Sequence, residues 1–113
     1  MPDCIFCKIA AGEIPAKIEH ADEDIVAFHD INAAAPVHLL VIPRRHIASL
    51  AETTDAEAPL LGRIVSVARQ LAAKFELDSG YRVVINCRED GGQSVPHIHL
   101  HLLGGRRLGW PPG

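Results

Sequence analysis

Residues 93–105 read QSVPHIHLHLLGG, and they hold three histidines in strict alternation, His97, His99 and His101. Isoleucine or leucine occupies the position after each of these histidines. Successive side chains of a β-strand point to opposite faces, so the alternation predicts a strand with imidazoles on one face and aliphatic groups on the other. The aliphatic face can pack against a core, which leaves the histidine face for solvent or for chemistry.

The rest of the chain contains other predicted strands and helices that can pair with this strand or pack against it. Three segments rich in β-branched and aromatic residues are predicted strands: 22–31 (DEDIVAFHDI), 35–43 (APVHLLVIP) and 81–87 (YRVVINC). From Asp55 to the DSG sequence at 78–80, apolar residues recur at the spacing of an amphipathic helix, namely Leu60, Leu61, Ile64, Ala68, Leu71, Ala72 and Phe75. Pro59 fits the first turn of that helix, where no amide is needed for its hydrogen bonds. A short helix is expected in CIFCKIAAG at 4–12.

These elements predict an α+β fold with a mainly antiparallel sheet. One long helix covers only part of such a sheet, so the uncovered part needs a site or a partner subunit. A chain of 113 residues is expected to form a single domain, 1–113.

Composition narrows the class of protein. The net charge is -3 and the basic residues are scattered, which argues against a nucleic-acid-binding protein. No apolar run approaches the roughly 20 residues that cross a bilayer, and the N-terminus MPDCIFCK lacks the apolar core of a signal peptide. Three cysteines, an odd number, do not form a disulfide framework. We therefore expect a cytoplasmic protein that does not act on membranes.

The histidine face has three interpretations. It can be a solvated strand face, although three alternating histidines before a Gly-Gly pair make this the weakest reading. It can bind a metal, because two imidazoles on one strand face converge on a single ion. It can carry a nucleophile, because a neutral imidazole attacks phosphorus well when an acceptor holds its other ring nitrogen. The turn GGQS at 91–94 offers hydroxyl and amide donors for a phosphate or a leaving group.

Ordered motifs along the chain resemble a known family. GEIPAKI, AFHDI, APVHLLVIP, RRHI, GYRVVIN, DGGQSVPHIHLHLLGGR and WPPG follow one another in the order found in the Hint branch of the histidine triad (HIT) superfamily. The resemblance extends from about Cys4 to Gly113. It implies a HIT-like fold with about five strands, one long helix and a short N-terminal helix.

The resemblance also implies an activity. Hint-like proteins hydrolyse the P–N bond of nucleoside 5′-phosphoramidates, of adenosine or another purine, through a nucleotidyl-histidine intermediate. By position, His99 is the nucleophile, His101 and His38 lie near the phosphate, and Ser94 assists the departing nitrogen. Hydrolysis of dinucleoside polyphosphates and a nucleotide-binding adaptor with incidental hydrolysis are the alternatives.

The same comparison implies a nucleotide pocket and a partner subunit. Asp30 matches a carboxylate that accepts hydrogen bonds from the ribose hydroxyls, and Asn86 matches an asparagine near the ribose and phosphate. The remaining positions expected in the pocket are Phe28, His29, Ile31, Gln93 and Val95. Members of this branch are homodimers joined through the long helix and a strand, and Trp110 would lie near the partner's site.

Cys4 and Cys7 form a Cys-x-x-Cys pair, which by itself indicates half a zinc site, a redox pair or coincidence. Some bacterial-type triad proteins and the galactose-1-phosphate uridylyltransferases bind structural zinc through such cysteines, and this resemblance implies His46 and His97 as the other ligands. The eukaryotic Hint pattern lacks both cysteines, so this chain departs from it here. With zinc bound, His97 would be structural, and the chemistry itself would need no cofactor.

Overall fold

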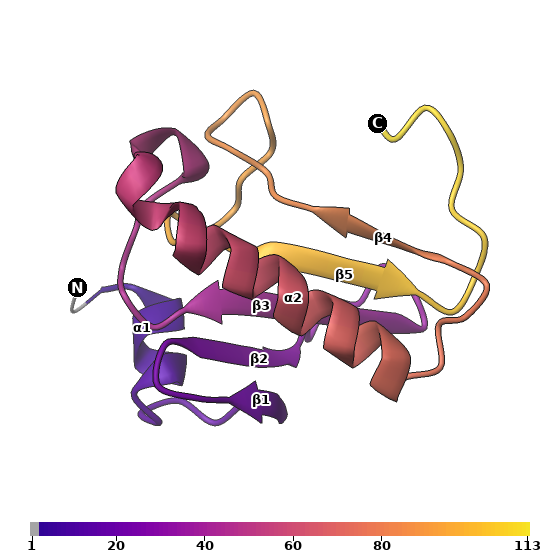
Figure 1. Cartoon of the computed structure of the whole chain (residues 1–113), viewed down its shortest axis with the longest axis horizontal. Coiled ribbons are helices and arrows are strands. Elements are labelled where there is room, and N and C mark those ends of the chain that lie inside the picture. Colours follow the sequence, from indigo (N-terminus) through magenta and orange to yellow (C-terminus); the bar gives the residue numbers. More distant parts are fainter. Residues whose placement is uncertain (1–2) are drawn as a thin grey trace.

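A five-stranded antiparallel sheet organises the computed structural model, which describes residues 3–113 (Figure 1). The spatial order of the strands is β1-β2-β3-β5-β4, and every neighbouring pair is antiparallel. The elements are α1 (Ile5–Ala10), β1 (Ile18–Ala21), β2 (Ile25–His29), β3 (Val37–Pro43), α2 (Ala58–Lys74), β4 (Tyr81–Val84) and β5 (Leu100–Gly104), with 3-10 turns at Leu50–Glu52 and Asp55–Glu57. The expected α+β fold, with one long helix and a short N-terminal helix, is confirmed. No helix within residues 3–113 is long and apolar enough to cross a membrane.

One face of the sheet packs against α2, which runs across the strands in Figure 1. Alternate residues of the central strands point to this helix, Leu39 and Val41 from β3 and Leu100 and Leu102 from β5. They meet the apolar stripe of α2, which includes Ile64, Val67, Ala68 and Leu71. The predicted helix is therefore confirmed, with Pro59 in its first turn. A capping box between Thr54 and Glu57 precedes it.

The opposite face of the sheet holds a second apolar cluster and polar side chains, among them His101. Phe6 and Cys4, from α1 and its N-cap, pack there against the strand residues Val26, Phe28, Leu40 and Ile42. Leu40 pairs with His101 and Val41 with Leu100, so the period of two places His101 on this face and Leu100 on the α2 face. The sheet thus separates the main core from His101 and from the second apolar cluster.

Two strand predictions need correction, and one strand was missed. The alternation predicted that His97, His99 and His101 share one strand, but β5 begins at Leu100, so His97 and His99 precede the regular ladder. The backbone there bonds elsewhere, because the Ile98 amide donates to the Ile47 carbonyl at 2.7 Å. β4 ends at Val84 rather than at residue 87, and β1 was not predicted as a strand.

Asp22 connects the turn between β1 and β2 to α2. Its carboxylate accepts hydrogen bonds from the amides of Asp24 and Ile25 at 2.8 and 2.9 Å. His20 Nε2 lies 2.7 Å and Arg63 Nη2 2.6 Å from its other oxygen. Burial alone would raise the pKa of this carboxyl, but these hydrogen bonds and the Arg63 charge hold it well below its usual range.

We expect Asp22→Asn to lower the free energy of unfolding by about 1–2 kcal/mol near pH 7, where the charge is present in both states. Because the folded pKa is depressed, the wild-type advantage is fully present above the unfolded pKa, about 4, and is lost as the pH falls below it. Urea denaturation of both proteins at about pH 7 and about pH 3 measures this. Asp24→Asn, at an exposed neighbouring position, is the control. A difference that is equally large at both pH values would contradict an electrostatic origin.

Candidate functional site

Three histidines meet on the sheet face opposite α2. His38 on β3 and His101 on β5 come from adjacent strands, and their ring centroids are 5.2 Å apart. His99, just before β5, has its ring centroid 4.9 Å from that of His101. The structure therefore brings together the predicted nucleophile and the two histidines expected beside the phosphate.

A chain of hydrogen bonds fixes the protons of two of these rings. The amide of Ala34 donates to His38 Nδ1 at 3.0 Å, so this nitrogen is an acceptor. The remaining proton of neutral His38 then lies on Nε2, which is 2.9 Å from His101 Nδ1. His101 therefore keeps its own proton on Nε2. A backbone amide thus sets the tautomer of both imidazoles.

Asp30 stands beside this chain, at the end of β2. One of its oxygens lies 3.4 Å from His38 Nε2, and the other accepts the amide of Asn32 at 2.8 Å. Asp30, His38 and His101 offer ligand atoms that all lie within 4.8 Å of one another. The two imidazoles are hydrogen-bonded to each other, and the carboxylate lies beside them.

His99 is held by a separate bond. Its Nδ1 lies 2.8 Å from the backbone carbonyl oxygen of His97. A carbonyl only accepts, so the proton is on Nδ1 and the lone pair is on Nε2. The side chain is only 3% exposed, which excludes bulk water from most of the ring. This is the arrangement that nucleophilic attack by histidine requires.

The surroundings keep the two supporting histidines neutral. Burial lowers the pKa of His101 to about 4, and the neighbouring His99 and His38 act in the same direction. Burial also lowers the pKa of His38, an effect that the Asp30 charge partly offsets. Near pH 7 both rings are therefore uncharged, as the hydrogen-bond chain requires.

The residues expected to wall the base do not all gather at one place. Phe28 faces the histidines and packs against Phe6, but Ile31 is 95% exposed. His29 points to the other side of the sheet, where its Nε2 lies 2.6 Å from Glu19 and its ring contacts Phe75. His29 and Phe28 therefore lie on opposite faces of the sheet, because consecutive residues of β2 face opposite ways.

The loop before the histidines is fastened by Gln93. Its amide nitrogen donates to the carbonyls of Ala48 and Val95 at 2.7 and 2.9 Å, and its oxygen accepts the amide of Arg88 at 2.8 Å. Val95 packs against the second apolar cluster, whereas the neighbouring Ser94 is exposed. The loop thus presents the Ser94 hydroxyl at the surface while its ends are fixed.

The other two predicted positions lie farther along the chain. Asn86 is half-buried just beyond the end of β4. Trp110, in the C-terminal tail, is 83% exposed, and no residue of the described chain covers most of its surface.

The four predicted zinc ligands converge. Cys4, Cys7, His46 and His97 offer ligand atoms that lie within 4.8 Å of one another. His97 Nδ1 is 3.3 Å from Cys4 Sγ and 3.5 Å from Cys7 Sγ, and His46 Nδ1 is 3.4 Å from Cys7 Sγ. The other ring nitrogen of His97 donates to the Pro43 carbonyl at 2.8 Å, which leaves Nδ1 free to bind a metal. Two sulfurs and two imidazole nitrogens are a donor set typical of structural zinc.

The surroundings of the Cys7 thiol disfavour its ionised form. Burial raises the pKa of Cys7, and its hydrogen bond with Cys4 raises it further. A bound metal ion would reverse this, because coordination deprotonates a thiol. The amide of Cys7 already points to Cys4 Sγ at 3.4 Å, a contact that favours a negatively charged sulfur.

Sequence patterns did not reveal several groups that build the site. The Ala34 amide and the Pro43 carbonyl are backbone atoms, which leave no signature in residue type. Phe6 lies between the two cysteines, and its ring contacts both His97 and His99. Its place in the Cys-x-x-Cys segment is the only sequence signal that could have linked it to the site.

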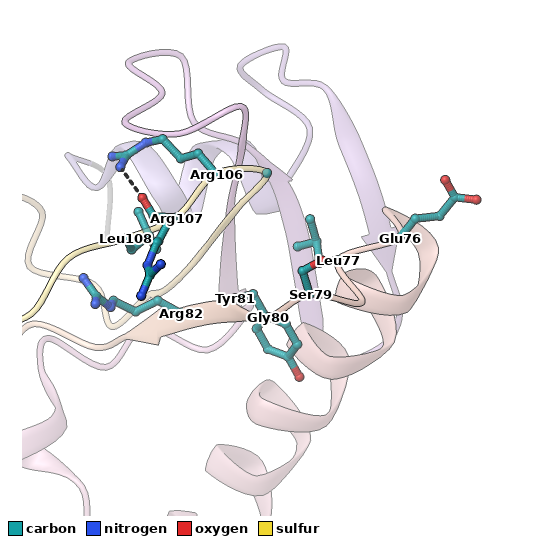
Figure 2. A pocket seen from close by; sticks show the side chains of 10 residues that line it. Glu76, Leu77, Ser79, Gly80, Tyr81, Arg82, Arg106, Arg107 and Leu108 are labelled. Carbon is teal, nitrogen blue, oxygen red and sulfur yellow. Dashed lines mark hydrogen bonds between the residues drawn. The ribbon is translucent and has the colours of Figure 1, made fainter.

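A hollow of about 740 Å³ lies away from these clusters, where β5 ends and β4 begins (Figure 2). Arg82, Arg106 and Arg107 line it, together with Glu76, Leu77, Ser79 and Gly80 of the turn after α2 and Tyr81 at the start of β4. Arg82 donates to the Gly109 carbonyl at 2.6 Å, and Arg106 donates to the Ala34 carbonyl at 2.9 Å. These arginines thus fasten the C-terminal segment, and Arg106 holds the loop whose amide orients His38.

Comparisons with known proteins show the family of this chain. The sequence matches the HIT domain family over residues 11–108. A HIT-like protein of Synechococcus elongatus is 50% identical over 111 residues, which cover 98% of this chain and 97% of that protein. A 14 kDa zinc-binding protein of Zea mays is 47% identical over 111 residues, covering 96% of this chain and 87% of that protein.

A solved structure supports the same family. The crystal structure of a HIT family hydrolase from Legionella pneumophila is 52% identical in sequence and superposes with a TM-score of 0.97. The match covers 98% of this chain and all of that chain. With the family match spanning most of its length, this chain belongs to the HIT family.

Proposed function

We propose that this protein hydrolyses the P–N bond of nucleoside 5′-phosphoramidates, with adenosine or another purine as the base. The observation that carries the proposal is the bond from His99 Nδ1 to the His97 carbonyl, 2.8 Å long, which leaves the Nε2 lone pair for attack. Membership of the HIT family supports a hydrolase acting on nucleotides, and the motifs GGQS and WPPG favour the Hint branch over the dinucleoside polyphosphate hydrolases.

The reaction has two steps. His99 Nε2 attacks the phosphorus, a bond forms between them, and the P–N bond to the amine breaks. The departing nitrogen takes up a proton with the help of the exposed Ser94 hydroxyl. Water then attacks the phosphorus of the nucleotidyl-histidine, releasing the nucleoside monophosphate and restoring His99.

The neighbouring groups suit the other parts of such a substrate. The Nε2 proton of His101 is free to donate to a phosphate oxygen, because its Nδ1 is already occupied by His38. The Asp30 carboxylate can accept the two ribose hydroxyls, and Asn86 would lie near the ribose and phosphate. Phe28 is proposed as part of the base wall, with Ile31 at its exposed rim, whereas His29 is not included.

We expect His99→Ala to reduce turnover of an adenosine 5′-phosphoramidate by at least about a thousandfold, because the covalent route is removed. Binding of AMP, measured by calorimetry, should change little. His20→Ala, outside the cluster, is the control and should keep wild-type turnover. Mass spectrometry of quenched wild-type protein should detect a nucleotidyl adduct on His99. A variant that keeps more than a few per cent of the wild-type rate would exclude His99 as the nucleophile.

The wild-type protein also allows the proposed phosphoramidase activity to be distinguished from the two alternative functions. Assayed side by side, the phosphoramidate should be hydrolysed with the higher kcat/KM than a dinucleoside polyphosphate. The reverse order would assign the protein to the other hydrolase class. Tight AMP binding with no turnover of either substrate would instead favour a nucleotide-binding adaptor.

We also propose that Cys4, Cys7, His46 and His97 hold one structural zinc ion. The convergence of the four side chains and the free Nδ1 of His97 support this, and the Zea mays relative is named for zinc binding. When bound, zinc would supply a cross-link between the N-terminal segment and the strand that begins after His99. It would take no part in the P–N chemistry.

Elemental analysis of protein purified without chelator should find about one zinc per chain. Cys4→Ser and Cys7→Ser should each lower the zinc content and the melting temperature, because metal binding contributes folding free energy. Cys87→Ser, at a cysteine outside the cluster, should change neither. A metal content near zero in the wild-type protein would contradict the assignment.

We further propose a homodimer joined along β4 and α2, in the cytoplasm. β4 is an edge strand, and Tyr81, Val83 and the α2 residue Val65 are 45%, 43% and 49% exposed. An open strand edge beside exposed apolar groups favours pairing with a second copy. The other edge strand, β1, contains an irregularity between Ile18 and His20 that disfavours such pairing.

Val83→Lys should shift the sedimentation coefficient from that of a dimer to that of a monomer, because it buries an unpaired charge at the proposed interface. Ile18→Lys, at an equally exposed position on the opposite edge strand, should leave the dimer intact. A wild-type protein that sediments as a monomer at high micromolar concentration would exclude the interface.

A further inference from the structure

Phe6 joins the metal-ligand cluster to the nucleophile. It lies in α1 between Cys4 and Cys7 and is only 7% exposed. Its ring meets that of His99 edge-on, with centroids 5.0 Å apart and an interplanar angle of 82°. It makes similar edge contacts with His97 at 5.9 Å and with Phe28 at 5.5 Å. One aromatic ring therefore contacts both a proposed zinc ligand and the proposed nucleophile.

The orientation of His99 needs such a contact. Its single ring hydrogen bond, from Nδ1 to the His97 carbonyl, fixes one atom of the imidazole. The terminal torsion of a histidine is broad, so one bond leaves the ring free to tilt about that atom. The rings of Phe6 and His101, with centroids 5.0 and 4.9 Å from that of His99, restrict this tilt. His101 is itself fixed by His38, and Phe6 adds a restraint from α1.

Phe6 in turn depends on the cluster. The helix α1 has six residues, too few to be stable alone, and Phe6 is its only buried residue. Cys4 at the N-cap and Cys7 inside the helix flank Phe6 and place both sulfurs against His97 Nδ1. The contacts that hold the two sulfurs therefore also hold the ring of Phe6.

We propose that Phe6 is a positioning residue for His99, and that the Cys4–Cys7–His46–His97 cluster orders the nucleophile through it. The inference rests on the proposed role of His99. In-line attack on phosphorus requires the Nε2 lone pair to point at the reacting atom, and small misplacements of a reacting group reduce the rate strongly. The cluster thus contributes to the geometry of the reaction without touching the substrate.

The test compares Phe6→Ala and Phe6→Leu with Phe75→Ala as a matched control. Phe75 also makes an edge contact with a histidine, His29, at 5.7 Å, but on the opposite face of the sheet. Four quantities are measured on each protein: kcat and KM for the phosphoramidate, zinc content, and the tautomer of His99 from long-range 1H–15N correlation spectra. The spectra need no turnover, so they report on His99 even if the substrate has been assigned wrongly.

Phe6→Ala is expected to lower kcat about tenfold or more, with a smaller change in KM. Its spectrum should show His99 as a mixture of tautomers, where the wild type shows one form with the proton on Nδ1. Phe6→Leu should recover part of both properties, because a branched apolar side chain still restricts the ring. Phe75→Ala should keep the wild-type kcat and spectrum despite its own loss of stability.

Two results would overturn the role of Phe6. One is a single Nδ1-protonated His99 with wild-type kcat in folded Phe6→Ala, or in Phe6→Leu if the alanine variant does not fold. The other is an equal loss in Phe75→Ala, which would indicate general destabilisation. A wild type that has one His99 tautomer but does not hydrolyse the substrate would count against the proposed function alone.

Metal removal tests the second half of the proposal. Wild-type protein treated with a chelator should show the same mixture of His99 tautomers as Phe6→Ala, and adding zinc back should restore one form. An unchanged spectrum in protein shown to be metal-free would exclude the link between the cluster and His99. In Phe6→Ala, zinc should have little effect on the His99 signals, because the connecting ring is absent.

Discussion

The hydrogen bond from His97 Nε2 to the Pro43 carbonyl, 2.8 Å long, is the contact on which the candidate site depends. It joins the end of β3 to the segment that leads into β5, and it fixes which nitrogen of His97 is free. The free Nδ1 faces Cys4 and Cys7, while the backbone carbonyl of the same residue holds His99. His97 is fully buried, so each of these bonds forms away from competing water. One residue therefore sets the geometry of both the proposed zinc-ligand cluster and the proposed nucleophile.

The sheet divides the molecule between stability and chemistry. Along β3, Leu39 and Val41 enter the core beneath α2, whereas His38 points to the opposite side. Along β5, Leu100 and Leu102 do the same, and His101 faces His38. The burial that stabilises the strands is thus provided by one set of side chains, and the neighbouring set is free to form the hydrogen bonds of the candidate site. Two neutral imidazoles side by side tolerate burial because each finds a hydrogen-bond partner.

Much of the fold was predictable because it follows from local periodicity. The stripe from Leu60 to Phe75 predicted α2, and the apolar segment at 35–43 predicted β3. The errors arose where long-range bonds replace the regular ladder. His97 and His99 fit the alternation of a strand, but the Ile98 amide bonds to Ile47 instead of to a neighbouring strand. The period of two also places Phe28 and His29 on opposite faces, yet only the position of α2 shows which face holds the site.

The sequence by itself determined the α+β fold, the common face of the alternating histidines and, through ordered motifs, the resemblance to the HIT family. These properties depend on residue type and on spacing along the chain, and both can be taken directly from the sequence. The tertiary structure alone decided the tautomers of His38, His99 and His101, because backbone atoms of Ala34 and His97 set them. It also decided that Cys4 lies against His97, 93 positions away, with Phe6 connecting that pair to His99. Contacts over such separations come from packing of the whole chain, and no local pattern encodes them.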